Sequence, residues 1–232
     1  IGFVGSVFSP YYALARRFGA AKPENFCALN VALYGPGVRR WTLTERGRDA
    51  LHATPRSLRI GPSSIEWHGD RLTVDVSERT APWGQRVRGR VSVFPTALST
   101  RVEPLDAAGR HRWRPLAPVA RAEVRFEQPA LNWGGSAYFD SNNGDEPLEQ
   151  AFASWTWSRS DLGGETAVLY DVIERSGVTR NLALRFDATG RAEAFPAPPG
   201  AALPKSAWGL SRHTRAPEGT RPTQLKSLED GP

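Results

Sequence analysis

The chain has 232 residues, enough for one large domain or for two domains of about 100 residues each. Hydrophobic residues make up 40% of it and aromatic residues 10%, so it can bury a core, and a globally disordered chain is excluded. No window approaches the roughly 18 uninterrupted apolar residues of a membrane-spanning helix. The net charge of +6 favours anionic lipid headgroups as a partner, whereas the lack of a basic block interleaved with aromatic residues argues against nucleic acid.

Cysteine and histidine are scarce. The single cysteine, Cys27, can form no internal disulfide, and we expect a buried, inert thiol. His52, His68 and His213 lie far apart in the sequence, so we expect no metal site. The chain contains no methionine, and residues 1–4 have the pattern of a strand interior, which suggests a fragment of a longer protein.

The first predicted element is a short helix from Tyr11 to Phe18. Ser9 is suited to cap its amino end, and Pro10 fits the first helical position because proline has no N–H to leave unpaired there.

Alternating apolar and polar residues then predict a series of β-strands. Residues 65–67 lead into a turn at residues 68–70, and apolar residues alternate again up to Val76, which predicts a hairpin. Pro95 should end the pairing of the next strand. The residues that share one face of that strand are Val87, Gly89, Val91 and Val93.

Strands are also predicted around Val124 and Phe126, at residues 182–187 and, after a turn, at residues 192–194. A short helical turn from Leu148 to Phe152 lies between them. Strands spaced by about 10 residues, with glycine and proline between them, indicate a barrel or a sandwich.

The remaining segments predict loops and a domain boundary. Residues 191–203, rich in proline and alanine, are typical of a loop, and the polar tail from Arg212 suggests poor order. The segment from Pro95 to Pro118 indicates a weak break, which places a boundary near residue 115 and two domains at 1–115 and 116–232.

The segment from His111 to Trp157 is the most informative part of the chain for function. It holds four of the eight tryptophans. Such aromatic density is typical of a core or of an elongated apolar cavity, and it also occurs on sugar-binding surfaces.

Several long stretches resemble the carotenoid 1,2-hydratases, also called hydroxyneurosporene synthases, and the resemblance covers nearly the whole chain. The stretches that carry it are residues 5–12, 26–35, 41–47, 135–142 and 144–147. The resemblance implies an all-β, lipocalin/calycin-like double β-barrel with a few short helical turns. It also implies a hydro-lyase that hydrates the terminal 1,2 double bond of acyclic carotenoids without a cofactor. The family's first strands and its aromatic carboxy-terminal end have no counterpart here.

The resemblance assigns catalytic roles to His111, Trp113, Tyr138 and Asp140. Protonation of an alkene requires a positioned acid that keeps its proton, and burial of Asp140 would raise its pKa in this sense. In an extended segment Tyr138 and Asp140 point to the same side, because side chains alternate along a strand. The faces of Trp113 and Tyr138 suit a developing cation, and His111 suits orientation or deprotonation of water.

Ordinary structural roles remain open for the same residues. Asp140 precedes a Ser-Asn-Asn-Gly sequence and fits a turn or cap, and His111 between arginines fits a solvent-facing loop. Trp113 and Tyr138 fit a plain core.

Two other functions compete with hydration. One is a lipocalin-like module that binds a hydrophobic ligand without chemistry. The other is carbohydrate hydrolysis with a carboxylate pair drawn from Asp140, Asp145 and Glu146, although those last two acids also fit a solvated or capping turn. A tocopherol-cyclase-like protein would share the protonation step but would use an internal phenol as the nucleophile.

An insoluble carotenoid substrate implies peripheral association with a membrane. We expect the cytoplasmic side of the inner or photosynthetic membrane of a photosynthetic bacterium.

Overall fold

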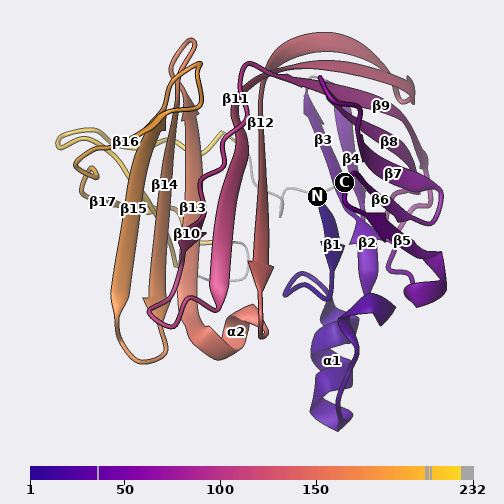
Figure 1. Ribbon diagram of the computed structural model, residues 1–232, viewed down its shortest axis with the longest axis horizontal. Helices are drawn as coiled ribbons and strands as arrows, with labels where there is room; N and C mark the ends of the chain where they lie inside the picture. The colour runs from indigo at the N-terminus through magenta and orange to yellow at the C-terminus, as the bar shows by residue number, and fades with distance from the viewer. Residues whose placement is uncertain (36, 207–208, 210, 226–232) are drawn as a thin grey trace. The chain divides into compact units, whose positions relative to one another are not determined.

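The computed structural model describes residues 1–35, 37–206, 209 and 211–225. Its secondary structure there is mostly β, which confirms the all-β class (Figure 1). None of the described helices is both long enough and apolar enough to cross a membrane. The helical elements are α1 (Pro10–Phe18), α2 (Leu148–Ala151) and the 3₁₀ turns Pro23–Asn25 and Arg48–Ala50.

The strands before residue 100 are β1 (Gly2–Val4), β2 (Cys27–Leu29), β3 (Val31–Gly35), β4 (Val38–Thr42), β5 (Leu51–Thr54), β6 (Ser57–Ile60), β7 (Ser63–Trp67), β8 (Leu72–Arg79) and β9 (Arg86–Pro95). The later strands are β10 (Glu103–Pro104), β11 (His111–Gln128), β12 (Ala130–Gly144), β13 (Phe152–Asp161), β14 (Thr166–Glu174), β15 (Thr179–Phe186), β16 (Ala192–Ala194), β17 (Gly200–Leu203) and β18 (Arg212–Arg215).

The chain divides into two compact units. Unit 1 contains residues Ile1–Pro95 and Ala120–Ala137, and unit 2 contains Thr96–Val119 and the described residues from Tyr138 onward. The boundary expected near residue 115 lies inside β11, whose two halves belong to different units. The division into two lipocalin-like domains at 115 stays a prediction.

Unit 1 is built on an antiparallel meander from β5 to β9. The predicted hairpin is confirmed, since Trp67 pairs with Leu72 across a turn in which Gly69 adopts a positive φ of 96°. The next strand ends at Pro95, as predicted. The buried cluster of this unit contains Leu29, Val76, Val87, Ala122, Val124 and Phe126.

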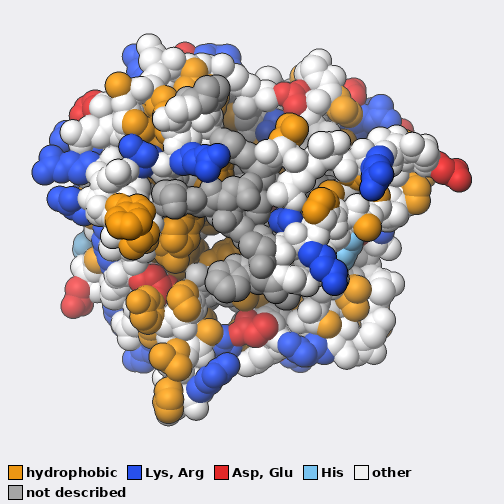
Figure 2. All heavy atoms as spheres, turned by 180° about the vertical axis from the view of Figure 1, so that it is seen from behind, with side chains coloured by type: hydrophobic (Ala, Val, Ile, Leu, Met, Phe, Trp, Pro, Cys, Tyr) orange, Lys and Arg blue, Asp and Glu red, His pale blue; other side chains and the backbone are white. Residues whose placement is uncertain are grey.

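The predicted amino-terminal helix is also confirmed. Helix α1 begins at Pro10, and the hydroxyl of Ser9 accepts a hydrogen bond from the backbone N–H of Tyr12 at 2.9 Å. Tyr12 is the buried residue of this helix and its ring packs on Phe26 at 5.3 Å. Hydrophobic side chains gather on the surface of α1 at the lower edge of Figure 2.

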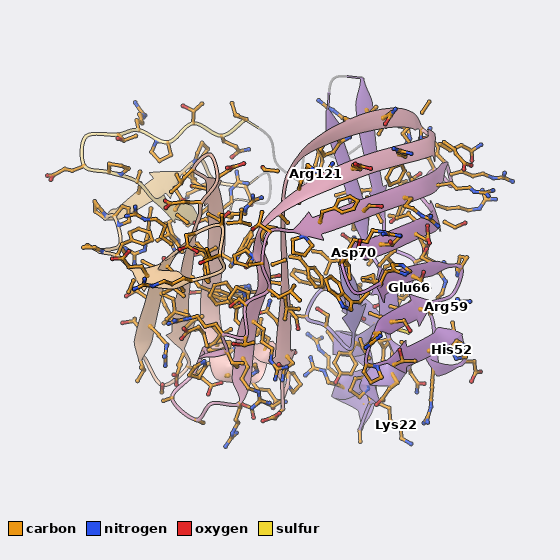
Figure 3. All side chains as sticks on the ribbon, turned by 45° about the horizontal axis from the view of Figure 1, so that its top comes forward. Lys22, His52, Arg59, Glu66, Asp70 and Arg121 are labelled. Atoms are coloured by element: carbon orange, nitrogen blue, oxygen red, sulfur yellow. The ribbon has the colours of Figure 1, made fainter. Side chains whose placement is uncertain are left out.

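The outer strands of unit 1 carry a polar row. His52 on β5 lies opposite Arg59 on β6, and Arg59 approaches Glu66 of β7 at 3.8 Å, as Figure 3 lets the reader follow. His52 and Arg59 are exposed. This row therefore lies on a solvated face of the sheet.

Unit 2 contains the sheet β13–β14–β15–β16, the hairpin of β17 with β18, and the first half of β11, which pairs with β10. The turn predicted at Leu148 to Phe152 is α2. The buried cluster of unit 2 contains Leu105, Trp113, Phe152, Val168, Tyr170, Val172, Leu184 and Phe186.

Two sequence expectations for the end of the chain were wrong in part. Residues 200–203, expected to be loop, form β17, and the tail begins with a strand, β18. Arg215 of β18 donates from Nε and Nη2 to Oδ2 and Oδ1 of Asp171 on β14, at 2.7 and 3.0 Å respectively. Local composition could not reveal a partner more than 40 residues away.

The strand pairings of the described residues close none of these sheets into a barrel. The predicted double barrel therefore stays a prediction.

Candidate active site

The site lies within unit 2 and begins with β11. Alternate residues of this strand point into the unit, and Trp113 is completely buried. Its indole contacts the rings of Tyr170 at 5.7 Å and Phe186 at 6.4 Å, measured between centroids. These contacts fix the plane of the indole, and with it the direction of the Nε1–H.

Strand β12 contributes Tyr138 and Asp140, which share one side of the strand as the alternation predicts. The Tyr138 ring packs on Trp157 of β13 at 5.5 Å. The guanidinium carbon of Arg159 lies 5.5 Å from the centre of the same ring.

Trp113 and Tyr138 hold a single oxygen of the Asp140 carboxyl group. The indole Nε1–H donates to Oδ2 at 2.8 Å, and the Tyr138 hydroxyl donates to the same atom at 3.0 Å. Within the described part of the chain Oδ1 has no hydrogen-bond partner, and it is not among the fully buried unpaired atoms. The carboxyl group is thus oriented through one oxygen and leaves the other available.

Burial raises the pKa of Asp140 above its ordinary value, and the hydrogen bonds from Trp113 and Tyr138 only partly oppose this. The pKa of Tyr138 is raised as well, first by burial and then by the charge of Asp140. Both groups therefore keep their protons to higher pH than in water.

A residue that sequence reasoning did not single out joins this group. Tyr170 of β14 is 6% exposed, and its hydroxyl donates to Oδ1 of Asn142 at 3.4 Å. Burial and then the charge of Asp140 raise the pKa of Tyr170. The only sequence signal was its place in an alternating apolar strand, which is equally typical of a core residue.

His111 is held by other partners. Its Nδ1 lies 2.6 Å from Oδ2 of Asp106, and its Nε2 lies 3.1 Å from the backbone carbonyl of Glu146. It is 2% exposed and is therefore not the solvent-facing histidine of the alternative interpretation. Gly144 gives the ring room, because a Cβ there would lie 2.7 Å from His111 Cδ2. Both ring nitrogens face oxygen atoms, and these two contacts fix the position of the ring.

Asp106 is the centre of a small buried network with His111. Burial would raise its pKa, but hydrogen bonds from the His111 side chain and from the backbone N–H groups of Arg110 and His111 outweigh burial and lower it. Asp106 was not among the residues that the sequence singled out.

The acidic turn at residues 145–146 is paired with arginines. Asp145 is bonded to Arg112, and Glu146 accepts from Arg110 at 2.8 Å. These ion pairs give both acids structural partners. Within the described residues no three His, Cys, Asp or Glu side chains gather into a potential metal site.

The fold and this group of residues define a class: an all-β protein with a partly buried carboxylic acid held by a tryptophan and a tyrosine. The family model "Carotenoid hydratase CrtC" matches residues 1–232. The chain belongs to this carotenoid hydratase family, as the resemblance predicted.

Curated relatives agree with the family. The chain is 52% identical to an acyclic carotenoid 1,2-hydratase of Thiocapsa roseopersicina and 46% identical to one of Rubrivivax gelatinosus, in both cases over 100% of its own length and 58% of theirs. A third enzyme of this name, from Cereibacter sphaeroides, is 44% identical over 100% of the chain and 82% of the relative. No solved structure matches the chain.

Proposed function

We propose that the protein adds water across the terminal 1,2 double bond of acyclic carotenoids and yields a tertiary alcohol. The observation that carries the proposal is Asp140, a carboxyl group with a raised pKa whose Oδ2 is held by Trp113 and Tyr138 while Oδ1 has no partner in the described chain. The name of the relatives, acyclic carotenoid 1,2-hydratase, supports the substrate and the reaction.

Asp140 acts as the general acid in this proposal. Because Oδ2 already accepts two hydrogen bonds, the proton resides on Oδ1 and leaves from there. It passes to the less substituted carbon of the double bond, which leaves a tertiary cation at the other carbon. General acid catalysis of this kind contributes about 10²- to 10⁴-fold.

The roles of the other residues follow from their contacts. Trp113 and Tyr138 orient the acid, and the aromatic ring of Tyr138 suits the developing cation, an interaction worth about 2 kcal/mol when desolvated. For His111 the bonds to Asp106 and Glu146 support a positioning role on the strand that carries Trp113. Its predicted action on water stays a prediction.

The decisive test measures turnover and binding separately. The protein is given neurosporene or lycopene in H₂¹⁸O, and mass spectrometry should find one heavy hydroxyl per hydrated end. Asp140→Asn should still bind the carotenoid but lose hydration, whereas Asp145→Asn, a change in an exposed ion pair, should retain it. Binding without turnover by the unsubstituted protein would instead indicate the non-catalytic lipocalin-like binder, and full activity of Asp140→Asn would refute the acid.

The fold of the complete relatives is part of the same proposal. We propose that the sheets belong to a lipocalin-like double barrel, on the support of the sequence resemblance. An experimental structure that contains the additional length of the relatives would test this, and sheets that stay open there would refute it.

We further propose that the protein associates peripherally with an anionic membrane surface, through α1. Tyr11, Leu14 and Phe18 lie on one side of this helix and are 65%, 51% and 85% exposed, respectively. Arg16 and Arg17 lie in its last turn, and its first turn has no acidic residue. An apolar face beside basic side chains is typical of helices that lie in the lipid interface.

Flotation with liposomes tests this surface. Vesicles containing phosphatidylserine should carry the protein at low salt, and Leu14→Ser with Phe18→Ser should abolish the association. Leu98→Ser with Leu162→Ser, at two exposed leucines outside α1, should leave it intact. Equal flotation of both double variants would contradict the assignment to α1.

A further inference from the structure

After protonation, hydration needs a second step in which water captures the cation. The inference about this step rests on the proposed function. A tertiary cation that meets no nucleophile loses a proton and reverts to an alkene. A group that holds water near the acid therefore decides whether protonation leads to alcohol. Of the four residues assigned by resemblance, Trp113 and Tyr138 are both bonded to Asp140. The ring nitrogens of the fourth, His111, are bonded to Asp106 and Glu146.

Tyr170 and Asn142 stand beside the acid with polar atoms that the protonation step does not use. Asn142 follows Tyr138 and Asp140 at every second position of β12, so the three side chains share one side of the strand. Tyr170 reaches this row from β14, and its ring contacts the indole whose Nε1–H holds Asp140. Asn142 is exposed, whereas Tyr170 is buried.

The hydrogen bond between them is weak and leaves capacity for another partner. At 3.4 Å it is long for an O–H···O bond, which is usually 2.5–3.0 Å. The phenol oxygen keeps acceptor capacity when its proton points to Asn142, and the amide nitrogen of Asn142 has two N–H donors. The pair therefore offers one acceptor and one donor to a single molecule at the edge of the buried site.

We propose that Tyr170 and Asn142 bind the water molecule that captures the cation. In this arrangement water donates one hydrogen bond to Tyr170 Oη and accepts one from Asn142, which leaves a lone pair for the cationic carbon. That lone pair forms the C–O bond, and the oxonium ion then transfers a proton to the Asp140 carboxylate. The sum is alkene plus water to alcohol, with the acid regenerated and no change of oxidation state that needs a redox partner.

The test separates protonation from water capture. In D₂O, protonation followed by proton loss leaves deuterium in the recovered carotenoid, whereas hydration gives the alcohol. Tyr170→Phe keeps the ring that packs on Trp113 and removes only the hydroxyl. Alcohol formation should fall about tenfold, the rate equivalent of one lost hydrogen bond, while deuterium in the recovered alkene per alcohol formed should rise.

Asn142→Ala is a second variant at an exposed position and should change the same ratio in the same direction. Tyr12→Phe, at a buried tyrosine of unit 1, is the matched control and should leave the ratio unchanged. If deuterium exchange and hydration fall together in both variants, or if neither changes, the water-binding role is wrong. If the unsubstituted protein shows neither exchange nor hydration, the proposed function fails first.

Discussion

At the scale of single residues, the protonation of Asp140 depends on a balance of opposed influences. Burial raises its pKa, whereas the hydrogen bonds from Trp113 and Tyr138 stabilise the carboxylate and lower it. The same two bonds orient the acid. The two hydrogen bonds therefore reduce the rise of the Asp140 pKa, and they also fix the direction in which the proton is transferred.

Trp113→Phe should separate these two effects. The acid must be protonated to act, so activity falls as pH rises through the pKa of Asp140. Loss of the indole N–H removes a hydrogen bond to the carboxylate, so the pKa of Asp140 should rise further. The alkaline limb of the kcat profile should therefore move to higher pH. The maximal kcat should decrease, because the acid is less well oriented. Trp83→Phe, at an exposed tryptophan, is the control. A limb that stays in place would show that the indole does not influence the acid.

Asp106 should make the stability of the protein depend on pH in the acidic range. Its folded pKa is lowered, so its contribution is present above the unfolded pKa and is lost as pH falls through the folded value. Asp106→Asn should cost about 1–3 kcal/mol at pH 7, because the buried carboxylate accepts hydrogen bonds from the His111 side chain and from two backbone N–H groups, which an amide only partly replaces. Denaturant unfolding should show this difference shrink below about pH 4. A cost that does not vary with pH would contradict the pairing.

At the scale of elements, α1 depends on its cap, because a helix of nine residues has too few internal hydrogen bonds to persist unaided. Ser9→Ala removes the oxygen that accepts from Tyr12 N–H and should destabilise the protein by about 1 kcal/mol in thermal or denaturant unfolding. Ser160→Ala, at an exposed strand position, should have little effect. Equal effects of the two changes would show that the cap is not specific.

Strand β18 is held to the sheet by a long-range ion pair. Arg215→Ala removes both hydrogen bonds to Asp171 and should cost about 1–2 kcal/mol. It should also increase the hydrogen exchange of the β17–β18 hairpin. Arg185→Ala, which removes an exposed guanidinium 3.8 Å from Glu165, should cost less than about 0.5 kcal/mol. A larger loss at Arg185 would contradict this ranking.

At the scale of the whole molecule, each unit has its own buried cluster. Phe186→Ala should leave a cavity in unit 2 that costs about 3–5 kcal/mol. Hydrogen exchange should then quicken in β13, β14 and β15 but not in β5 to β8. Uniform loss of protection throughout the described chain would show instead that the two cores unfold as one.

Much of the local structure was predictable because it depends on neighbours in sequence. The cap at Ser9, the turn at Gly69 and the end of β9 at Pro95 each depend on a few adjacent residues, and each was predicted correctly. The pairing of β18 was not predictable, since it depends on Asp171, which is distant in sequence.

The sequence by itself determined the family, through its long characteristic stretches, and the all-β class, through a period of two that strand geometry imposes. It also placed Tyr138 and Asp140 on one side of a strand. Only the tertiary structure decided that Trp113 and Tyr138 hold the same oxygen of Asp140, that His111 is bonded to Asp106, and that Tyr170 is bonded to Asn142. Those contacts join separate strands, and local patterns carry no information on which strands pack together.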